Sequence, residues 1–152
     1  MTAISETIQT NAGLYTEDYY LWLQQNLELL RLHKFNDVDW ENLLEEIADM
    51  GKSEKRAITS NLRILLMHLL KYKYQTDKPT NTWLFTIREH RKRLREALTM
   101  SHSLKIYSQE VFAESYQDAR ELAADETGVA INTFPADAPF TPEDAINPDY
   151  LP

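Results

Sequence analysis

The chain has 152 residues, a length typical of one domain, and its 43% hydrophobic and 26% charged residues are ordinary for a globular protein. The absence of cysteine excludes disulfides, thiolate nucleophiles and Cys-ligated zinc, and three glycines are too few to favour the phosphate-binding loops of Rossmann or P-loop proteins. The net charge of −8 opposes long-range attraction to nucleic acid. We therefore expect a single helical domain over residues 1–152 that binds no cofactor.

No segment indicates a membrane anchor or an export signal. The apolar run Ile64–Met67 ends at His68 and is far shorter than the ~20 residues that a membrane-spanning helix requires. The segment Met1–Leu14 lacks the basic start and the apolar centre of a signal peptide. We expect a cytoplasmic protein without a membrane contact, in which residues 1–14 form an N-terminal extension.

Apolar residues recur at helical spacing, which predicts an all-α fold, a compact bundle of about five helices. The first helix is predicted to begin at a Thr16 cap and to run to about Lys34. Its expected apolar face consists of Tyr20, Leu23, Leu27 and Leu30. Asp39 is predicted to cap a second helix that ends at Gly51. The residues of this helix that are expected to face inward are Trp40, Leu43, Leu44 and Ile47.

The third predicted helix begins at Ser53 and is apolar on most sides, which favours a central position in the bundle. Its apolar stripe consists of Ile58, Leu62, Leu65, Leu66 and Leu69. Thr76–Thr80 is predicted to be a turn before the fourth helix. The apolar positions of the fourth helix are Trp83, Ile87, Leu94 and Leu98. A fifth helix is predicted from about Ser103 to Gly128, since glycine is common just after helix ends.

The segment after the fifth helix has a different composition. Residues 133–152 contain five of the six prolines. Within this Pro-rich C-terminal tail, Thr141–Asp144 is predicted to form a capped helical turn. Phe134, Phe140 and Tyr150 predict that the tail packs on the bundle, because exposed aromatic rings would favour burial.

Several short motifs are distributed along most of the chain. They are Tyr19–Leu23, Asp39–Ile47, Met50–Gly51, Ser53–Arg56, Leu65–Lys71, Trp83, Ile87–Arg88, Tyr116, Ala119–Arg120 and Phe134–Pro135. In this combination the sequence resembles a family of bacterial, mainly cyanobacterial, proteins catalogued as domain of unknown function 29. The resemblance implies a small all-helical fold and no assigned reaction.

The charges are distributed unevenly along the chain. Residues 52–95 have a net charge of +9, whereas residues 1–51 have −8 and residues 96–152 have −9. A basic face is predicted on the fourth helix, made by Arg88, Lys92 and Arg95. Such a face can neutralise phosphates, or its charges can pair with the acidic helices of the same fold. We favour pairing within the fold and keep a nucleic-acid-binding protein or weak ribonuclease that uses residues 52–95 as the alternative.

A loose motif bears on the ribonuclease alternative. The spacings from Arg63 to His68 and from Arg95 to His102 resemble the Arg-to-His spacing of helical ribonucleases of the HEPN type. Such matches arise by chance in a chain with this many Arg and His residues, and Ile64 follows Arg63 where the motif has a small polar residue. The motif therefore adds little weight.

Three polar residues, His68, His90 and Asp118, are predicted on the apolar sides of three different helices. Two imidazoles beside a carboxylate could transfer protons or supply part of a metal site. They could instead be hydrogen-bonded groups that satisfy buried donors and fix helix register. We favour the structural role and expect no catalytic residue and no metal ligand.

The sequence therefore favours a non-enzymatic interaction module that binds another protein or itself through an aromatic-rich surface. Whether Arg88, Lys92 and Arg95 are buried or exposed separates this hypothesis from the nucleic-acid alternative. If the three cations pair with acidic residues of the same chain, the alternative loses its main support.

Overall fold

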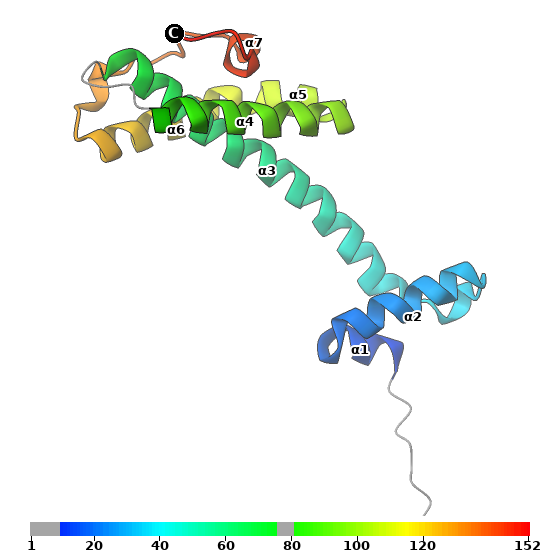
Figure 1. The fold of residues 1–152 in the computed structure, drawn as a ribbon. Helices are drawn as coiled ribbons and strands as arrows, with labels where there is room; N and C mark the ends of the chain where they lie inside the picture. Colours follow the sequence, from blue (N-terminus) through cyan, green and yellow to red (C-terminus); the bar gives the residue numbers. More distant parts are fainter. Residues whose placement is uncertain (1–9, 76–80) are drawn as a thin grey trace, which may run out of the picture. The chain divides into compact units, whose positions relative to one another are not determined.

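The computed structural model describes residues 10–75 and 81–152, and within these ranges the fold is all-α, as predicted, with no strand (Figure 1). The α-helices are α1 (Asn11–Glu17), α2 (Tyr19–Arg31), α3 (Trp40–Tyr74), α4 (Asn81–Met100), α5 (Leu104–Glu110), α6 (Phe112–Thr127) and α7 (Pro142–Ile146). Two short 3-10 helices are η1 (Phe35–Asp37) and η2 (Ile131–Thr133). The predicted turn at Thr76–Thr80 lies outside the described residues.

Backbone contacts divide the chain into two units, and α3 contributes residues to both. Unit 1 comprises the residues up to Lys52, and unit 2 comprises Ser53–Pro152. Of the expected N-terminal extension, residues 1–9 lie outside the described ranges, whereas Asn11–Leu14 begins α1.

The predicted first helix is divided into α1 and α2, so its expected start at Thr16 is wrong. Thr10 caps α1 through a bond from the backbone N–H of Gly13, and Asp18 caps α2 through a bond from the N–H of Leu21. The Thr16 hydroxyl instead donates to the Gly13 carbonyl inside α1. A new cap at Asp18 restarts the helix because its carboxylate satisfies an N–H that the first turn leaves free.

The end of α2 also differs from the prediction of a helix to Lys34. His33 follows the helix with a φ of 57°, and the N–H of Lys34 bonds to the carbonyl of Leu29. The N–H of His33 bonds to the carbonyl of Leu30. These two bonds form a Schellman motif, which usually has glycine in the left-handed position that His33 occupies here.

The buried side of α2 is not the predicted face. Tyr20, Leu23 and Leu27 are exposed, whereas Trp22 and Asn26 are buried. Asn26 exchanges two hydrogen bonds with Asn11 and accepts a third from the backbone N–H of Asp39. Partly buried hydrogen bonds of Asn26 and the buried Trp22 indole therefore stabilise this part of unit 1 in place of a leucine stripe.

Helix α3 begins where Asp39 was predicted to cap it, with the Asn42 N–H bonding to the Asp39 carboxylate. It does not end at Gly51 but continues to Tyr74, so the two predicted helices are one. A single glycine inside a helix costs only ~1 kcal/mol, which the neighbouring helix-forming residues outweigh. The expected inward face is also wrong, because Trp40, Leu44 and Ile47 are exposed.

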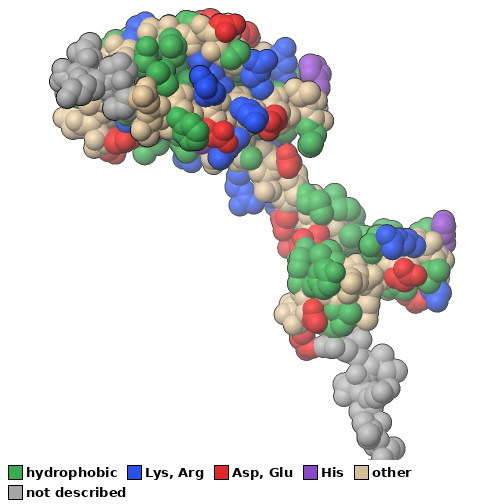
Figure 2. All heavy atoms as spheres, viewed as in Figure 1, with side chains coloured by type: hydrophobic (Ala, Val, Ile, Leu, Met, Phe, Trp, Pro, Cys, Tyr) green, Lys and Arg blue, Asp and Glu red, His purple; other side chains and the backbone are tan. Residues whose placement is uncertain are grey.

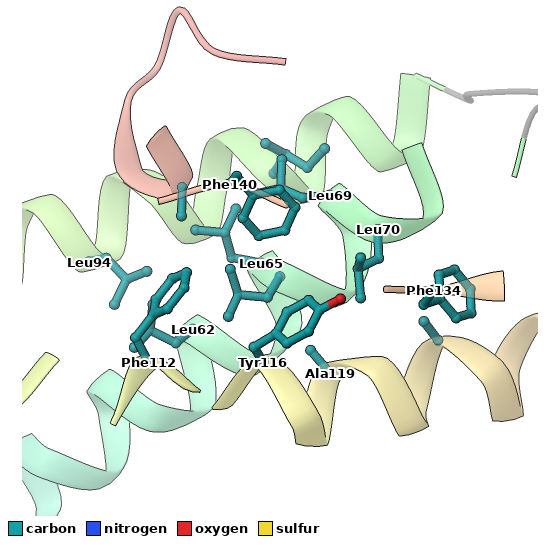
Figure 3. Close-up of a cluster of buried hydrophobic side chains, with 14 of the residues drawn as sticks. Leu62, Leu65, Leu69, Leu70, Leu94, Phe112, Tyr116, Ala119, Phe134 and Phe140 are labelled. Carbon is teal, nitrogen blue, oxygen red and sulfur yellow. The ribbon is translucent and has the colours of Figure 1, made fainter. Parts of the chain in front are cut away.

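The second half of α3 forms the centre of unit 2, as its apolar stripe predicted. Ile58, Leu62, Leu65, Leu66 and Leu69 are all buried. Figure 3 shows their neighbours from three other segments pointing toward the same centre: Leu94 of α4, Phe112 and Tyr116 of α6, and Phe140 of the tail. Val111 divides the predicted fifth helix into α5 and α6, and Gly128, with a φ of 71°, ends α6 as predicted.

The Pro-rich tail packs on unit 2, as predicted, and Phe134 and Phe140 are buried. Side chains of α6 bind its backbone: Tyr116 donates to the Pro135 carbonyl, Gln117 to that of Ala136 and Arg120 to that of Phe134. The predicted turn is α7, which has a capping box between Thr141 and Asp144. The side chains of α6 thus satisfy carbonyls that an irregular segment cannot pair by itself.

Candidate functional site

An open groove with a volume of about 890 Å³ runs along α4 in unit 2. One side of the helix contributes a row of residues to it: Leu84, Ile87, Arg88, Arg91, Lys92, Arg95, Glu96, Thr99 and Met100. Pro148 and Leu151 of the tail complete the lining. The row repeats every three or four residues, so it covers one face along nearly the whole of α4. We call this surface the α4 groove.

The α4 groove is basic as well as apolar. It contains four cationic side chains and one acidic side chain, Glu96. Figure 2 shows Lys and Arg side chains over the surface of unit 2 where α4 lies. Apolar side chains such as Leu84 and Met100 lie at the two ends of the row. A ligand with both apolar and negatively charged groups would match this lining.

The three residues of the predicted basic face, Arg88, Lys92 and Arg95, are exposed and line the α4 groove. Only Lys92 forms an ion pair with another described residue: its Nζ lies 4.0 Å from Oε1 of Glu96, and both side chains are well exposed. Exposed pairs of this kind contribute little to stability. Most of the charge on this face is therefore not balanced by pairing within the described part of the chain.

Arg91 is the residue of the site whose role the sequence did not reveal. Its side chain is only 3% exposed, and Nε donates to the Ala145 carbonyl at 2.8 Å, at the last turn of α7. Its Nη2 atom is buried without a hydrogen-bond acceptor among the described residues. Burial lowers the pKa of Arg91 from its ordinary value, and the nearby Tyr150 acts in the opposite direction. Its spacing from Ile87 and Leu94 could have identified the buried position of Arg91, but not the tail carbonyl that it binds.

The cluster predicted from His68, His90 and Asp118 has the following geometry. Each of the three residues is partly buried. His68 Nδ1 lies 2.9 Å from the Ile64 carbonyl oxygen, and His90 Nδ1 lies 2.7 Å from Oδ1 of Asn61. Burial is the main cause that lowers the pKa of both imidazoles, and His68 lowers that of His90 further. The Asp118 side chain has no hydrogen bond or ion pair with another residue in ranges 10–75 and 81–152.

In these contacts His68 is hydrogen-bonded to the backbone of its own helix, and His90 is hydrogen-bonded to Asn61 of α3. The two imidazoles influence each other electrostatically, but Asp118 contributes no bond to either within the described ranges. Among the described residues, no three His, Asp or Glu side chains are grouped so that they could hold a metal ion. No helix in these ranges is long and apolar enough to cross a membrane.

A second polar cluster, which the sequence did not predict, lies in unit 1. The hydroxyls of Tyr15 and Tyr19 both donate to the carboxylate of Glu46, and the two rings pack against Trp22. The hydrogen bond to Glu46 is the main cause that raises the pKa of Tyr15 to about 12. The indole N–H of Trp22 donates to Asp39. The cluster fastens α1 and α2 to the start of α3.

Residues 14–151 match the family described as domain of unknown function DUF29, and the chain belongs to this family. The match covers most of both units. No curated protein and no solved structure matches the chain.

Proposed function

We propose that this protein is a cytoplasmic protein–protein interaction module without catalytic activity, and that it binds its partner through an apolar face at the start of α3. The observation that carries the proposal is the exposure of Leu44, Ile47 and Met50, which are 63%, 56% and 59% accessible. The three residues follow one another at intervals of three, so they share one side of the helix. We call them the α3 apolar face.

Other exposed apolar side chains of unit 1 also support a protein partner. Tyr20 and Leu27 of α2 are also exposed, and Figure 2 shows hydrophobic and acidic side chains together on the surface of unit 1. Soluble proteins seldom expose grouped large apolar side chains unless these take part in binding. The Tyr15 and Tyr19 bonds to Glu46 hold this part of α3 in place. A fixed surface loses less conformational entropy when a partner binds.

The partner is expected to be basic around its own apolar centre. Glu41 and Glu45 of α3 are exposed and form no ion pair with another described residue. Glu41 is three residues before Leu44 and therefore lies beside it on the helix surface. An apolar centre with an acidic border favours a complementary partner and repels acidic proteins.

The proposal is tested with the double variant Leu44→Glu/Ile47→Glu. Partners bound to the full chain would be identified in an extract of the source organism, purified, and their Kd measured directly. We expect the double variant to weaken binding of the purified partner at least tenfold. Ile106→Glu is the matched control, because Ile106 is equally exposed but lies on α5. Equal affinities of the double variant and the wild type would refute the proposal.

A second candidate function is nucleic-acid binding, and the exposure of Arg88 and Arg95 without ion pairs to described residues favours it. The net charge of −8 and the apolar side chains within the same groove favour a protein ligand instead. Fluorescence anisotropy with a labelled RNA and a labelled DNA duplex separates the two candidates. Binding that weakens with salt, and that Arg88→Ala/Arg95→Ala removes, would establish the second candidate.

A further inference from the structure

The α4 groove has the properties of a docking site that its own chain leaves open. Its basic side chains Arg88 and Arg95 form no ion pair with a described acidic residue. The groove follows α4 from Leu84 to Met100. A single small anion would engage only part of this row. An elongated ligand with several carboxylates and several apolar groups matches the row better.

Arg91 is the buried and oriented cation of the groove. A charged donor that is buried without an acceptor loses its hydration and gains no hydrogen bond in return. Nη2 of Arg91 is in this situation, and Arg91 is one of the residues that line the groove. Because Nε already holds the Ala145 carbonyl, the guanidinium is fixed in orientation. Arg91 therefore adds a fixed positive charge to the lining of the groove.

A surface with the complementary chemistry is present on this chain itself. The α3 apolar face carries Leu44, Ile47 and Met50, and Glu41 and Glu45 lie on the same helical turns without ion pairs to described residues. Residues 1–51 have a net charge of −8, whereas residues 52–95 have +9. The two surfaces therefore pair apolar with apolar and acidic with basic side chains.

We infer that the α4 groove of one molecule binds the α3 apolar face of a second copy of this chain, in a head-to-tail contact. The inference rests on the proposed function, because it names the partner of the same α3 apolar face. The contact uses two different surfaces, so after pairing one molecule keeps a free face and the other keeps a free groove. Such contacts continue into rings or open chains unless the geometry closes them.

The charges and the apolar groups have separate roles in this contact. Burial of Leu44, Ile47 and Met50 against Leu84 and the other apolar lining would supply most of the affinity. The opposite charges would set orientation and association rate, and added salt would weaken the contact.

The test uses the full chain and two complementary variants. Leu44→Glu/Ile47→Glu disrupts the α3 apolar face, and Arg88→Glu/Arg95→Glu reverses the charge of two cations of the α4 groove. All these residues are exposed in the structure, and circular dichroism verifies that the variants remain helical. Sedimentation velocity over a range of concentrations measures self-association. We expect the wild type to associate in a concentration- and salt-dependent manner, and each variant alone to lose association.

The mixture of the two variants is the decisive measurement. One variant keeps an intact groove and the other an intact face, so an equimolar mixture should form a one-to-one complex and nothing larger. Lys105→Glu and Ile106→Glu on α5 are controls for charge and for apolar surface, and they should associate like the wild type.

A mixture that remains monomeric, or a groove variant that associates as well as the wild type, would overturn the inference. A wild-type chain that is monomeric at every concentration would overturn it too. The proposed function would then still stand if a different protein binds the wild type and is lost with Leu44→Glu/Ile47→Glu. If Leu44→Glu/Ile47→Glu binds every partner of the wild type with unchanged affinity, the proposed function itself fails.

Discussion

The ammonium group of Lys71 on α3 lies 2.8 Å from Oε1 of Glu126 on α6, and the same group lies 4.6 Å from the centre of the Trp83 ring on α4. The Lys71 side chain is 4% exposed and that of Glu126 is 52% exposed. The ion pair is therefore one-sided: the cation is buried, and water reaches the carboxylate. Three helices of unit 2 meet at this one charge.

Removal of the Glu126 charge is expected to destabilise the fold. Glu126→Gln leaves the buried ammonium of Lys71 without its counterion, and partial exposure of the site limits the cost to about 1–2 kcal/mol of unfolding free energy. Urea denaturation measures the difference. Asp125→Asn, an exposed neighbour, should change the unfolding free energy by less than ~0.5 kcal/mol. Equal effects of the two variants would show that the ion pair does not contribute.

Two glycines should respond to the same substitution with opposite signs. Gly51 lies inside α3, and an added Cβ would have no atom within 4 Å, so Gly51→Ala should raise the unfolding free energy by about 0.5–1 kcal/mol. Gly128 has a φ of 71°, so Gly128→Ala should lower it by about 1 kcal/mol. Thermal unfolding of both variants provides the measurement. Destabilisation by Gly51→Ala would mean that α3 is interrupted there.

The two ends of α3 should differ in their tolerance of truncated leucines. Leu66 is fully buried in the core of unit 2, so Leu66→Ala should cost about 2–5 kcal/mol. Leu44→Ala should change the unfolding free energy by less than ~0.5 kcal/mol in the monomer, since Leu44 is exposed. Chemical denaturation at low protein concentration tests both values, and a large effect at Leu44 would contradict its exposed position.

Tyr15 should ionise at unusually high pH. Its hydrogen bond to Glu46 is the main cause that raises its pKa from 10.0 to about 12. A raised pKa means that the folded state favours the protonated hydroxyl, so the stabilisation is complete below pH 10 and is lost as the pH rises through about 12. The difference in phenolate absorbance between the wild type and Tyr15→Phe reports this pKa. Glu46→Gln should lower it toward 10, and Glu45→Gln should have a smaller effect.

His68 should destabilise the fold in acid. Burial is the main cause that lowers its pKa below 6.5, so the folded state favours the neutral imidazole. The contribution of His68 to stability is therefore complete above pH 6.5 and is lost as the pH decreases through the folded-state pKa. Nuclear magnetic resonance titration of the imidazole, compared with the unfolded chain, measures the shift. A pKa at or above 6.5 would show that the ring is solvated.

The core of unit 2 was predictable because the helical spacing of apolar residues is sufficient to identify it. From Ile58 to Leu69 the apolar residues of α3 lie on a stripe that the neighbouring helices cover, so periodicity identifies the buried side. The same rule failed for Leu27, Leu44 and Ile47. Periodicity shows that a helix has an apolar side, but it does not show that the same chain covers that side.

The candidate site was predictable only in part. Arg88, Lys92 and Arg95 were expected to share a face, and they do line one groove. The groove also depends on Pro148 and Leu151. Contacts over such a separation follow from tertiary packing, which local spacing does not encode.

Side chains of α6 bind the backbone of the tail, and this affects which amino acids the tail can accept. Tyr116, Gln117 and Arg120 bind the carbonyl oxygens of Pro135, Ala136 and Phe134, which nearly every amino acid would present equally. A saturation mutagenesis library should therefore accept many amino acids at Ala136 and Asp137 and few at Tyr116 and Arg120. Among homologous sequences, we expect Tyr116 and Arg120 of α6 and the buried Phe134 to vary little, and Ala136 and Asp137 to vary freely.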